Sequence, residues 1–181
     1  MQLNRAVALL LVMSSALIAL SGCLPLVRAG QGPTPLPVTQ EAAQRLEDKL
    51  YAAMKQSLVS DFTLEATQEE VTSYLALKLP DMPFLQPQVR FAPDRVIFTG
   101  NMTQPIAAPV HVAGSAQAQD GKVTVVLQEA KLGFLSVPGF VLQSISDTMN
   151  ELLAESQGAI QISRLQILEG KVIVSGRIKR S

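Results

Sequence analysis

The sequence is short of the residues that most often supply catalytic and metal-binding chemistry. Its 181 residues include one cysteine, one histidine and no tryptophan, and aromatic residues make up only 4%. A single cysteine cannot form a disulfide within the chain, and with His111 as the one histidine no metal site of ordinary ligand spacing is available. With so few aromatic side chains, the core must consist mainly of Leu, Val, Ile, Ala and Met.

An excess of charge of either sign is also missing. The chain has 15 basic and 15 acidic residues. A balanced charge gives no electrostatic footprint for nucleic acid and no steering toward anionic lipid head groups. We therefore expect no nucleic-acid partner.

The sequence contains no motif of a known catalytic site. The segment 133–138 holds a serine but is not a Gly-x-Ser-x-Gly elbow. Glu69 and Glu70 are adjacent carboxylates, but the first turn of a helix prefers acidic residues in any case. His111 lies alone on the wetter face of a predicted strand, which is more typical of a structural role. We predict a protein that is not an enzyme, with no catalytic residues, no metal and no cofactor.

The N-terminus has the three parts of a secretory signal. Arg5 is its only charge, an apolar run follows from Ala6 to Leu20, and the small residues Ser21 and Gly22 close it. The run is shorter than the roughly 20 residues of an ordinary membrane-spanning helix. The alternatives are a signal peptide followed by a coincidental cysteine, or an uncleaved membrane helix.

The stretch Leu20-Ser21-Gly22-Cys23 resembles the lipobox of bacterial lipoproteins. In that family the cysteine thiol receives a diacylglyceryl group, and cleavage leaves the modified cysteine as the first residue. The resemblance implies a signal peptide over residues 1–22, lipidation at Cys23, and a mature chain on the extracytoplasmic face of the bacterial cell envelope, periplasmic or at the cell surface. Two or more acyl chains, such as palmitate, anchor a protein far more firmly than one.

A spacer and a single domain are predicted after the cysteine. Residues 23–40 contain four prolines and two glycines, a density that prevents a helix and favours an extended linker. Residues 41–181 show helical periodicity over 41–59, 67–79 and 140–153, and strand periodicity in the remaining segments. Turn signals at Asp120-Gly121 and Glu169-Gly170 predict two hairpins. Together they predict an α+β fold with a curved antiparallel sheet of about six strands packed against two or three helices.

Four segments in order carry a second resemblance. They are Phe62 to Leu75, the hairpin over 88–100, the turn Asp120-Gly121, and 133–138 leading into an amphipathic helix. Together they resemble the YpmS-like extracytoplasmic proteins and, more distantly, the tubular lipid-binding (TULIP-like) superfamily, in which a curved sheet wraps a long helix around an apolar channel. The resemblance covers Asp61 to Arg177. It implies a lipid-binding fold and no active site, although YpmS begins with a spanning helix where this chain has a lipobox.

We therefore expect the protein to bind a lipid or another long apolar ligand in a groove between sheet and helix. A dry, empty channel of about 500 Å³ would cost on the order of 10 kcal/mol, as much as the whole stability of a domain, so it must be occupied, wet or collapsed. The predicted lining residues are Val110, Val112, Val125, Leu127, Val141, Ile145 and Met149. The alternative is that these seven form an ordinary core, and that the protein is a structural or interaction lipoprotein that scaffolds an envelope complex through a protein partner.

Overall fold

The structure is a computed structural model that describes residues 34–58, 60–79, 82–158 and 160–178. The predicted signal peptide, Cys23 and most of the predicted spacer lie outside these residues. Residues 35–181 form one compact unit.

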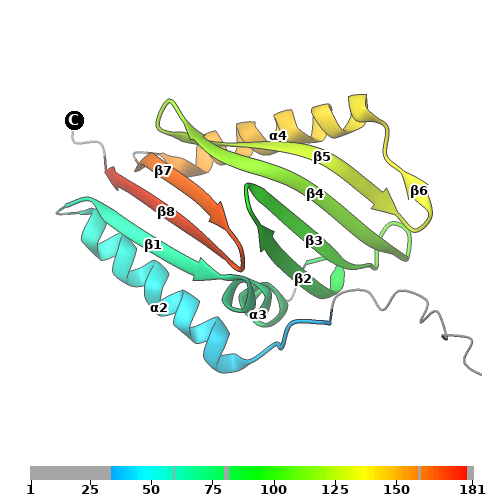
Figure 1. Ribbon diagram of the computed structural model, residues 1–181, viewed down its shortest axis with the longest axis horizontal. Coiled ribbons are helices and arrows are strands. Elements are labelled where there is room, and N and C mark those ends of the chain that lie inside the picture. The colour runs from blue at the N-terminus through cyan, green and yellow to red at the C-terminus, as the bar shows by residue number, and fades with distance from the viewer. Residues whose placement is uncertain (1–33, 59, 80–81, 159, 179–181) are drawn as a thin grey trace, which may run out of the picture. The chain divides into compact units, whose positions relative to one another are not determined.

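The described residues form an α+β fold, as predicted, with three helices and two antiparallel sheets (Figure 1). A five-stranded sheet has the order β2-β3-β4-β5-β6, and a three-stranded sheet has the order β1-β8-β7. The elements along the chain are α2 (Gln40–Ser57), β1 (Phe62–Thr67), α3 (Gln68–Lys78), β2 (Phe84–Ala92), β3 (Arg95–Met102), β4 (Ala108–Gln119), β5 (Lys122–Leu132), β6 (Leu135–Ser136), α4 (Gly139–Gln157), β7 (Ile160–Leu168) and β8 (Lys171–Ile178).

Local sequence signals position the ends of these elements. The stretch Thr67-Gln68-Glu69-Glu70 predicts a capping box at the start of α3. The structure confirms it: the Thr67 hydroxyl accepts a hydrogen bond from the Glu70 N–H, and the Glu70 carboxylate accepts one from the Thr67 N–H. Asp120 and Gly121 both have positive φ angles, as a two-residue hairpin turn requires. The register of β7 against β8 shifts between Ile162 and Arg164, where the hydrophobic phase predicts a bulge.

The last residues of the predicted spacer bond to the folded unit. The Leu36 N–H donates to the Gln88 side-chain oxygen at 2.6 Å, and the Gln88 amide nitrogen lies 3.4 Å from the Leu36 carbonyl oxygen. Three residues later the Ser73 hydroxyl of α3 accepts a hydrogen bond from the Thr39 N–H at 3.1 Å. The chain is therefore attached to β2 and α3 before the first helix begins.

Strand β7 joins the two sheets. Its Ile162 N–H donates to the Gly121 carbonyl oxygen in the β4–β5 turn at 2.9 Å. At its other end the Ile167 carbonyl accepts from the Asp94 N–H at 3.1 Å. The same two isoleucines are buried, Ile162 with Phe62 in one core cluster and Ile167 with Phe91 in the other. Each core cluster therefore contains a residue of β7.

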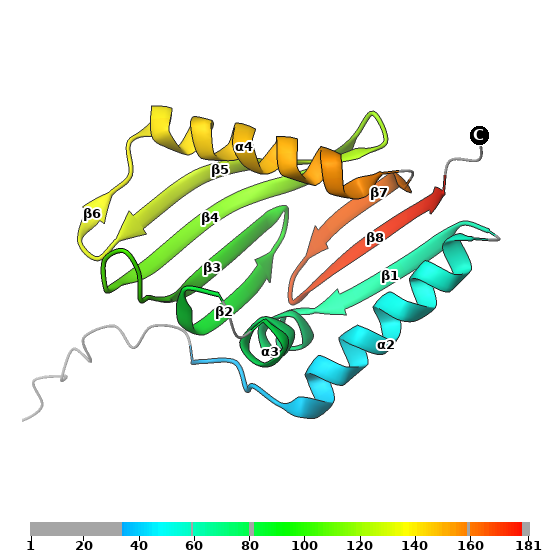
Figure 2. The ribbon, with the colours of Figure 1, turned by 180° about the vertical axis from the view of Figure 1, so that it is seen from behind.

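Polar side chains from two helices satisfy backbone groups that the sheet leaves unpaired. At the β2 edge, the Thr72 hydroxyl of α3 accepts from the Val89 N–H at 2.9 Å and donates to the Val89 carbonyl at 3.3 Å. At the β5 edge, the Asn150 side chain of α4 accepts from the Val125 N–H at 2.7 Å and donates to its carbonyl at 3.0 Å. Figure 2 shows α4 running along β5. Each of these side chains takes the place of a neighbouring strand and closes an edge that could otherwise pair with another chain.

The buried face of α4 differs from the one that its sequence predicts. Periodicity predicts an inward arc of Val141, Leu142, Ile145, Met149, Leu152 and Leu153, with Asn150 on the outer side. In the structure Leu142 is buried beside Ser146 and Asn150, while Ile145, Met149 and Leu152 are exposed. The Ser146 hydroxyl accepts from the Leu127 N–H at 2.9 Å, which continues the contact that Asn150 begins. Polar groups face β5 because unpaired backbone groups cost more to leave unsatisfied than apolar side chains cost to expose.

Replacing the amide that closes the β5 edge should destabilise the domain. Asn150→Leu leaves the Val125 N–H and carbonyl without a protein partner, and we expect the free energy of unfolding to fall by about 2 kcal/mol. Gln143→Leu, a matched change at an exposed position of the same helix, should shift it by less than about 0.5 kcal/mol. Urea unfolding measures both. Equal effects of the two changes would contradict the role of Asn150.

Candidate functional site

An apolar groove of about 270 Å³ lies between α2 and the three-stranded sheet. None of the side chains that line it is charged, and all except one serine are apolar. The lining residues are Leu50, Ala53, Met54 and Ser57 of α2, Phe62 and Leu64 of β1, Ile160 and Ile162 of β7, and Val174 of β8.

Strand pairing across the three-stranded sheet places the floor of the groove. Phe62 pairs with Gly176 of β8, and Gly176 in turn pairs with Ile162 of β7. A Cβ atom at Gly176 would lie 3.1 Å from the Phe62 ring and 2.5 Å from the Gln161 carbonyl oxygen. A larger residue is therefore excluded at position 176, and the missing side chain leaves room for the Phe62 ring against β8.

Helix α2 forms the roof of the groove and leaves part of its apolar stripe in water. The sequence predicts one inward stripe of Leu46, Leu50, Met54 and Leu58. In the structure Leu46 is buried, but Met54 is 65% exposed at the groove and Leu58 is exposed as well. The small residues Ala53 and Ser57 turn toward the sheet instead. The prediction is wrong for the second half of the stripe, in which Met54 lies at the mouth of the groove and Leu58 is exposed outside it.

Glu70 of α3 fixes the position of α2. Both oxygens of its carboxylate bond to the Lys49 ammonium, at 2.8 and 2.9 Å, and Arg45 lies 3.4 Å away. The Glu70 side chain is only 3% exposed. Burial on its own would raise the pKa of this carboxyl, but hydrogen bonds from Lys49 and the Thr67 N–H, together with the positive charges, outweigh burial and lower the pKa. Glu70 is therefore ionised and paired under ordinary conditions.

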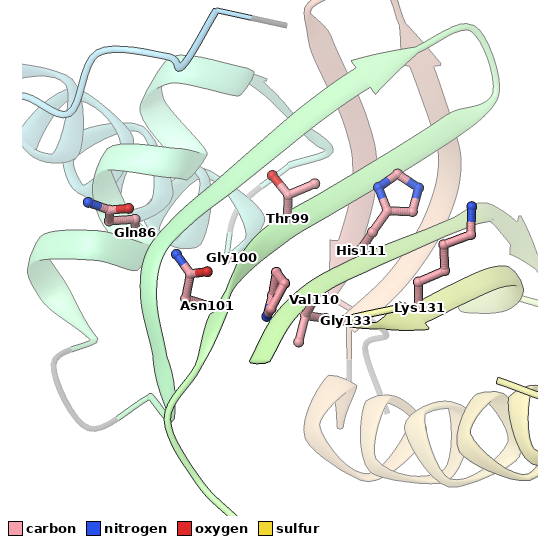
Figure 3. Close-up of a pocket in the computed structure, with 9 residues that line it drawn as sticks. Gln86, Thr99, Gly100, Asn101, Val110, His111, Lys131 and Gly133 are labelled. Atoms are coloured by element: carbon pink, nitrogen blue, oxygen red, sulfur yellow. The ribbon is translucent and has the colours of Figure 1, made fainter. Parts of the chain in front are cut away.

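A second hollow, of about 390 Å³, lies over β3, β4 and β5 and is more polar (Figure 3). Thr99, His111 and Lys131 line it from adjacent positions in the sheet register, and Gln86 and Asn101 add side-chain amides.

The charge at this second hollow is already neutralised. The Lys131 ammonium bonds to Glu129 at 2.8 Å, and Arg95 lies 3.3 Å from the other oxygen of the same carboxylate. The hydrogen bond from Lys131 and its charge lower the pKa of Glu129. Because Lys131 is paired with Glu129, its ammonium is not a free cation in the hollow. The lining of the hollow is polar, so an apolar ligand fits the groove under α2 better.

The seven predicted lining residues lie on β4, β5 and α4, and none of them lines the groove under α2. Val125 and Leu127 carry the backbone groups that α4 binds. Val112 pairs with Ala130 in the sheet, Val110 lines the polar hollow, and on α4 Val141 is half-buried while Ile145 and Met149 are exposed. The ligand-binding role of these residues stays a prediction.

Sequence reasoning missed the groove because its floor depends on pairing between distant strands. Phe62 and Leu64 alternate along β1, and Ile160 and Ile162 alternate along β7, so the strand periodicity was visible. The pairing of β1 with β8 joins segments more than 100 residues apart in the sequence, such as Phe62 and Gly176, and no local signal gives it.

Neither a metal site nor a membrane-spanning helix is found among the residues that the structure describes. Within residues 34–58, 60–79, 82–158 and 160–178, no group of three or more His, Cys, Asp or Glu side chains could hold a metal ion. In that same part of the chain, no helix combines the length and the hydropathy needed to cross a membrane.

Removing the charge of Glu70 should loosen α2 in a pH-dependent way. We expect Glu70→Gln to lower the free energy of unfolding at pH 7 by about 2 kcal/mol, because a buried acceptor for two cations is lost. Glu69→Gln, at a side chain that is 40% exposed, should cost less than about 0.5 kcal/mol.

The pH dependence follows from the lowered pKa of Glu70. Its pKa in the folded protein lies below the ordinary value of 4.5, so its contribution is complete above that value and disappears as the pH falls through the folded pKa. Urea unfolding at a series of pH values should therefore show the deficit of Glu70→Gln at neutral pH and its decline in acid. A deficit that does not change with pH would contradict the assignment.

Comparison with known protein families, with curated proteins and with solved structures gave no match. The resemblance to YpmS-like and tubular lipid-binding proteins therefore stays an expectation from the sequence. What the protein does must be inferred from its own groove, hollow and charges.

Proposed function

We propose that the protein is a membrane-anchored extracytoplasmic lipoprotein that binds a lipid acyl chain, or another long apolar molecule, in the groove beneath α2. The observation that supports this is the uncharged lining of the groove, in which eight of the nine residues are apolar. Ligand sites are concave and mostly apolar, with few polar groups, and this groove has those properties.

Water finds few hydrogen-bond partners in this groove. Its one polar side chain, Ser57, already donates a hydrogen bond to the Met54 carbonyl at 2.7 Å. A water molecule needs two to four polar partners to be well bound, so water at the apolar walls is readily displaced. Covering the apolar walls with a ligand would contribute about 25 cal/mol for each Å² of apolar surface removed from water, before the entropic cost of binding.

The size of the groove favours part of a lipid over a whole one. Its volume of about 270 Å³ is just below the roughly 300–1,000 Å³ of typical small-molecule sites. A single flexible chain fits such a space, and any polar head group would remain outside, past the exposed Met54.

Charge at the mouth of the groove should reduce binding. Met54→Glu places a carboxylate at the groove, and we expect it to weaken binding of the uncharged probe N-phenylnaphthylamine by about tenfold, because the charge must lose water when the probe enters. Tyr51→Glu is the matched control: Tyr51 is also on α2 and is 61% exposed, but it does not line the groove. A chain that begins at Leu24 retains the whole compact unit and suits fluorescence titration.

Two results would count against the groove as the binding site. One is equal loss of binding in Met54→Glu and Tyr51→Glu. The other is the absence of saturable binding in the unchanged protein, which would favour the alternative of a scaffold for an envelope complex.

Lipidation at Cys23 can be tested separately. The mass of the protein extracted from cell membranes should equal that of a chain that begins at Cys23 and carries acyl groups. We expect Cys23→Ser to stop this processing and to remove the modification. An intact N-terminus with an unmodified thiol in the native protein would overturn the proposed anchor.

A further inference from the structure

Five large apolar side chains are exposed at one end of the five-stranded sheet. They are Leu85, Ile106, Phe134, Leu135 and Phe140, called the apolar end below. Phe134 is 94% exposed and Phe140 is 77% exposed. Single exposed apolar residues are ordinary, but a group of them marks a contact surface.

The topology of the sheet brings these residues together from four segments. Leu85 pairs with Asn101 near the end of β3, and Ile106 lies in the loop from β3 to β4. The Gly133 N–H donates to the Pro109 carbonyl at 2.7 Å, which fixes the turn before β6 beside that loop. Figure 1 shows the β3–β4 loop, β6 and the start of α4 at the same end of the sheet.

The segments that build this end contain no charged side chain. Residues 82–89, 96–110 and 132–146 have no Asp, Glu, Lys or Arg, although the chain as a whole has 30. Surfaces that face only water carry charges at a substantial fraction of their positions. The absence of charged side chains over three separate segments points to an apolar environment. Because basic residues are missing too, binding at this end would not depend on anionic lipids.

We propose that the apolar end inserts into the hydrocarbon boundary of a lipid bilayer. The attachment of the N-terminal segment supports this occupant. Leu36 is bound to Gln88 of β2, the strand that also carries Leu85. Pro35 follows Cys23 by 12 residues, which can span at most about 40 Å. An anchor at Cys23 therefore keeps the apolar end within reach of the membrane at a high effective concentration.

This inference rests on the membrane anchor of the proposed function and is independent of the groove. The chain has no tryptophan, so Phe134→Trp introduces a single reporter at the apolar end. A chain that begins at Cys23 can be coupled through its only thiol to a maleimide lipid in phosphatidylcholine vesicles. This coupling supplies the tether whether or not cells acylate Cys23, so failure of the lipidation proposal would not affect the result.

On these vesicles the Phe134→Trp emission should move to shorter wavelength and be quenched by brominated phosphatidylcholine. Tyr51→Trp, on α2, is the matched control and should keep the emission of a solvent-exposed indole and show no quenching. Adding Ile106→Ser and Phe140→Ser to Phe134→Trp should reduce the quenching. Without a tether, we expect Phe134→Ser to lower partition of the chain from Leu24 onto the same vesicles by about tenfold, and Val126→Ser, at another exposed apolar residue, to leave it unchanged.

Two outcomes would overturn the inference. One is an unshifted, unquenched emission from Phe134→Trp on the tethered vesicles, which would leave the apolar end in water or available to a protein. The other is a blue shift that grows with protein concentration in the absence of vesicles, which would show that a second copy of the chain covers this end.

Discussion

The arrangement of the helices depends on polar side chains that bond to strand backbone. Thr72 of α3 and Asn150 of α4 each satisfy both the N–H and the carbonyl of one residue in the five-stranded sheet, Val89 and Val125 respectively. At a strand edge in water, the backbone N–H and carbonyl groups bond to water, but the edge can still pair with another chain and aggregate. At an edge covered by an apolar helix, the same groups would have no hydrogen-bond partner. An amide or hydroxyl on the helix avoids both outcomes. The Asn150 amide also fixes the position of α4 along β5.

The unit has two apolar surfaces, and they differ in shape. Under α2 the apolar side chains form a concave groove, and the paired charges of Glu70 and Lys49 hold the helix that covers it. At the apolar end the side chains project from strand ends, loops and a helix start, and charges are missing from the segments that carry them. A concave apolar surface suits a single chain of a ligand, whereas projecting side chains suit the boundary of a bilayer. The proposed functions of the two regions are therefore compatible in one protein.

The elements could be predicted from the sequence because their signals are local. Thr67 and Glu70 are three residues apart, Asp120 and Gly121 are adjacent, and each pair determines a cap or a turn without help from the rest of the chain. The candidate site could not be predicted in this way, since Phe62 meets Gly176 only through non-local pairing of β1 with β8. Helical periodicity also predicts that Asn150 faces water. It does so because a hydrophobic pattern does not reflect the hydrogen bonds that the backbone at a strand edge requires. The groove and the face of α4 therefore emerge only in three dimensions.

Strand β7 has a consequence for communication across the unit. The side chain of Ile162 lines the groove, while its N–H donates to the Gly121 carbonyl in the β4–β5 turn. A guest that shifts the backbone of this isoleucine would also strain that bond, because the side chain and the N–H belong to one residue. Strand β7 therefore links the groove directly to the β4–β5 hairpin, and strand β5 of that hairpin is bonded to α4 through Asn150.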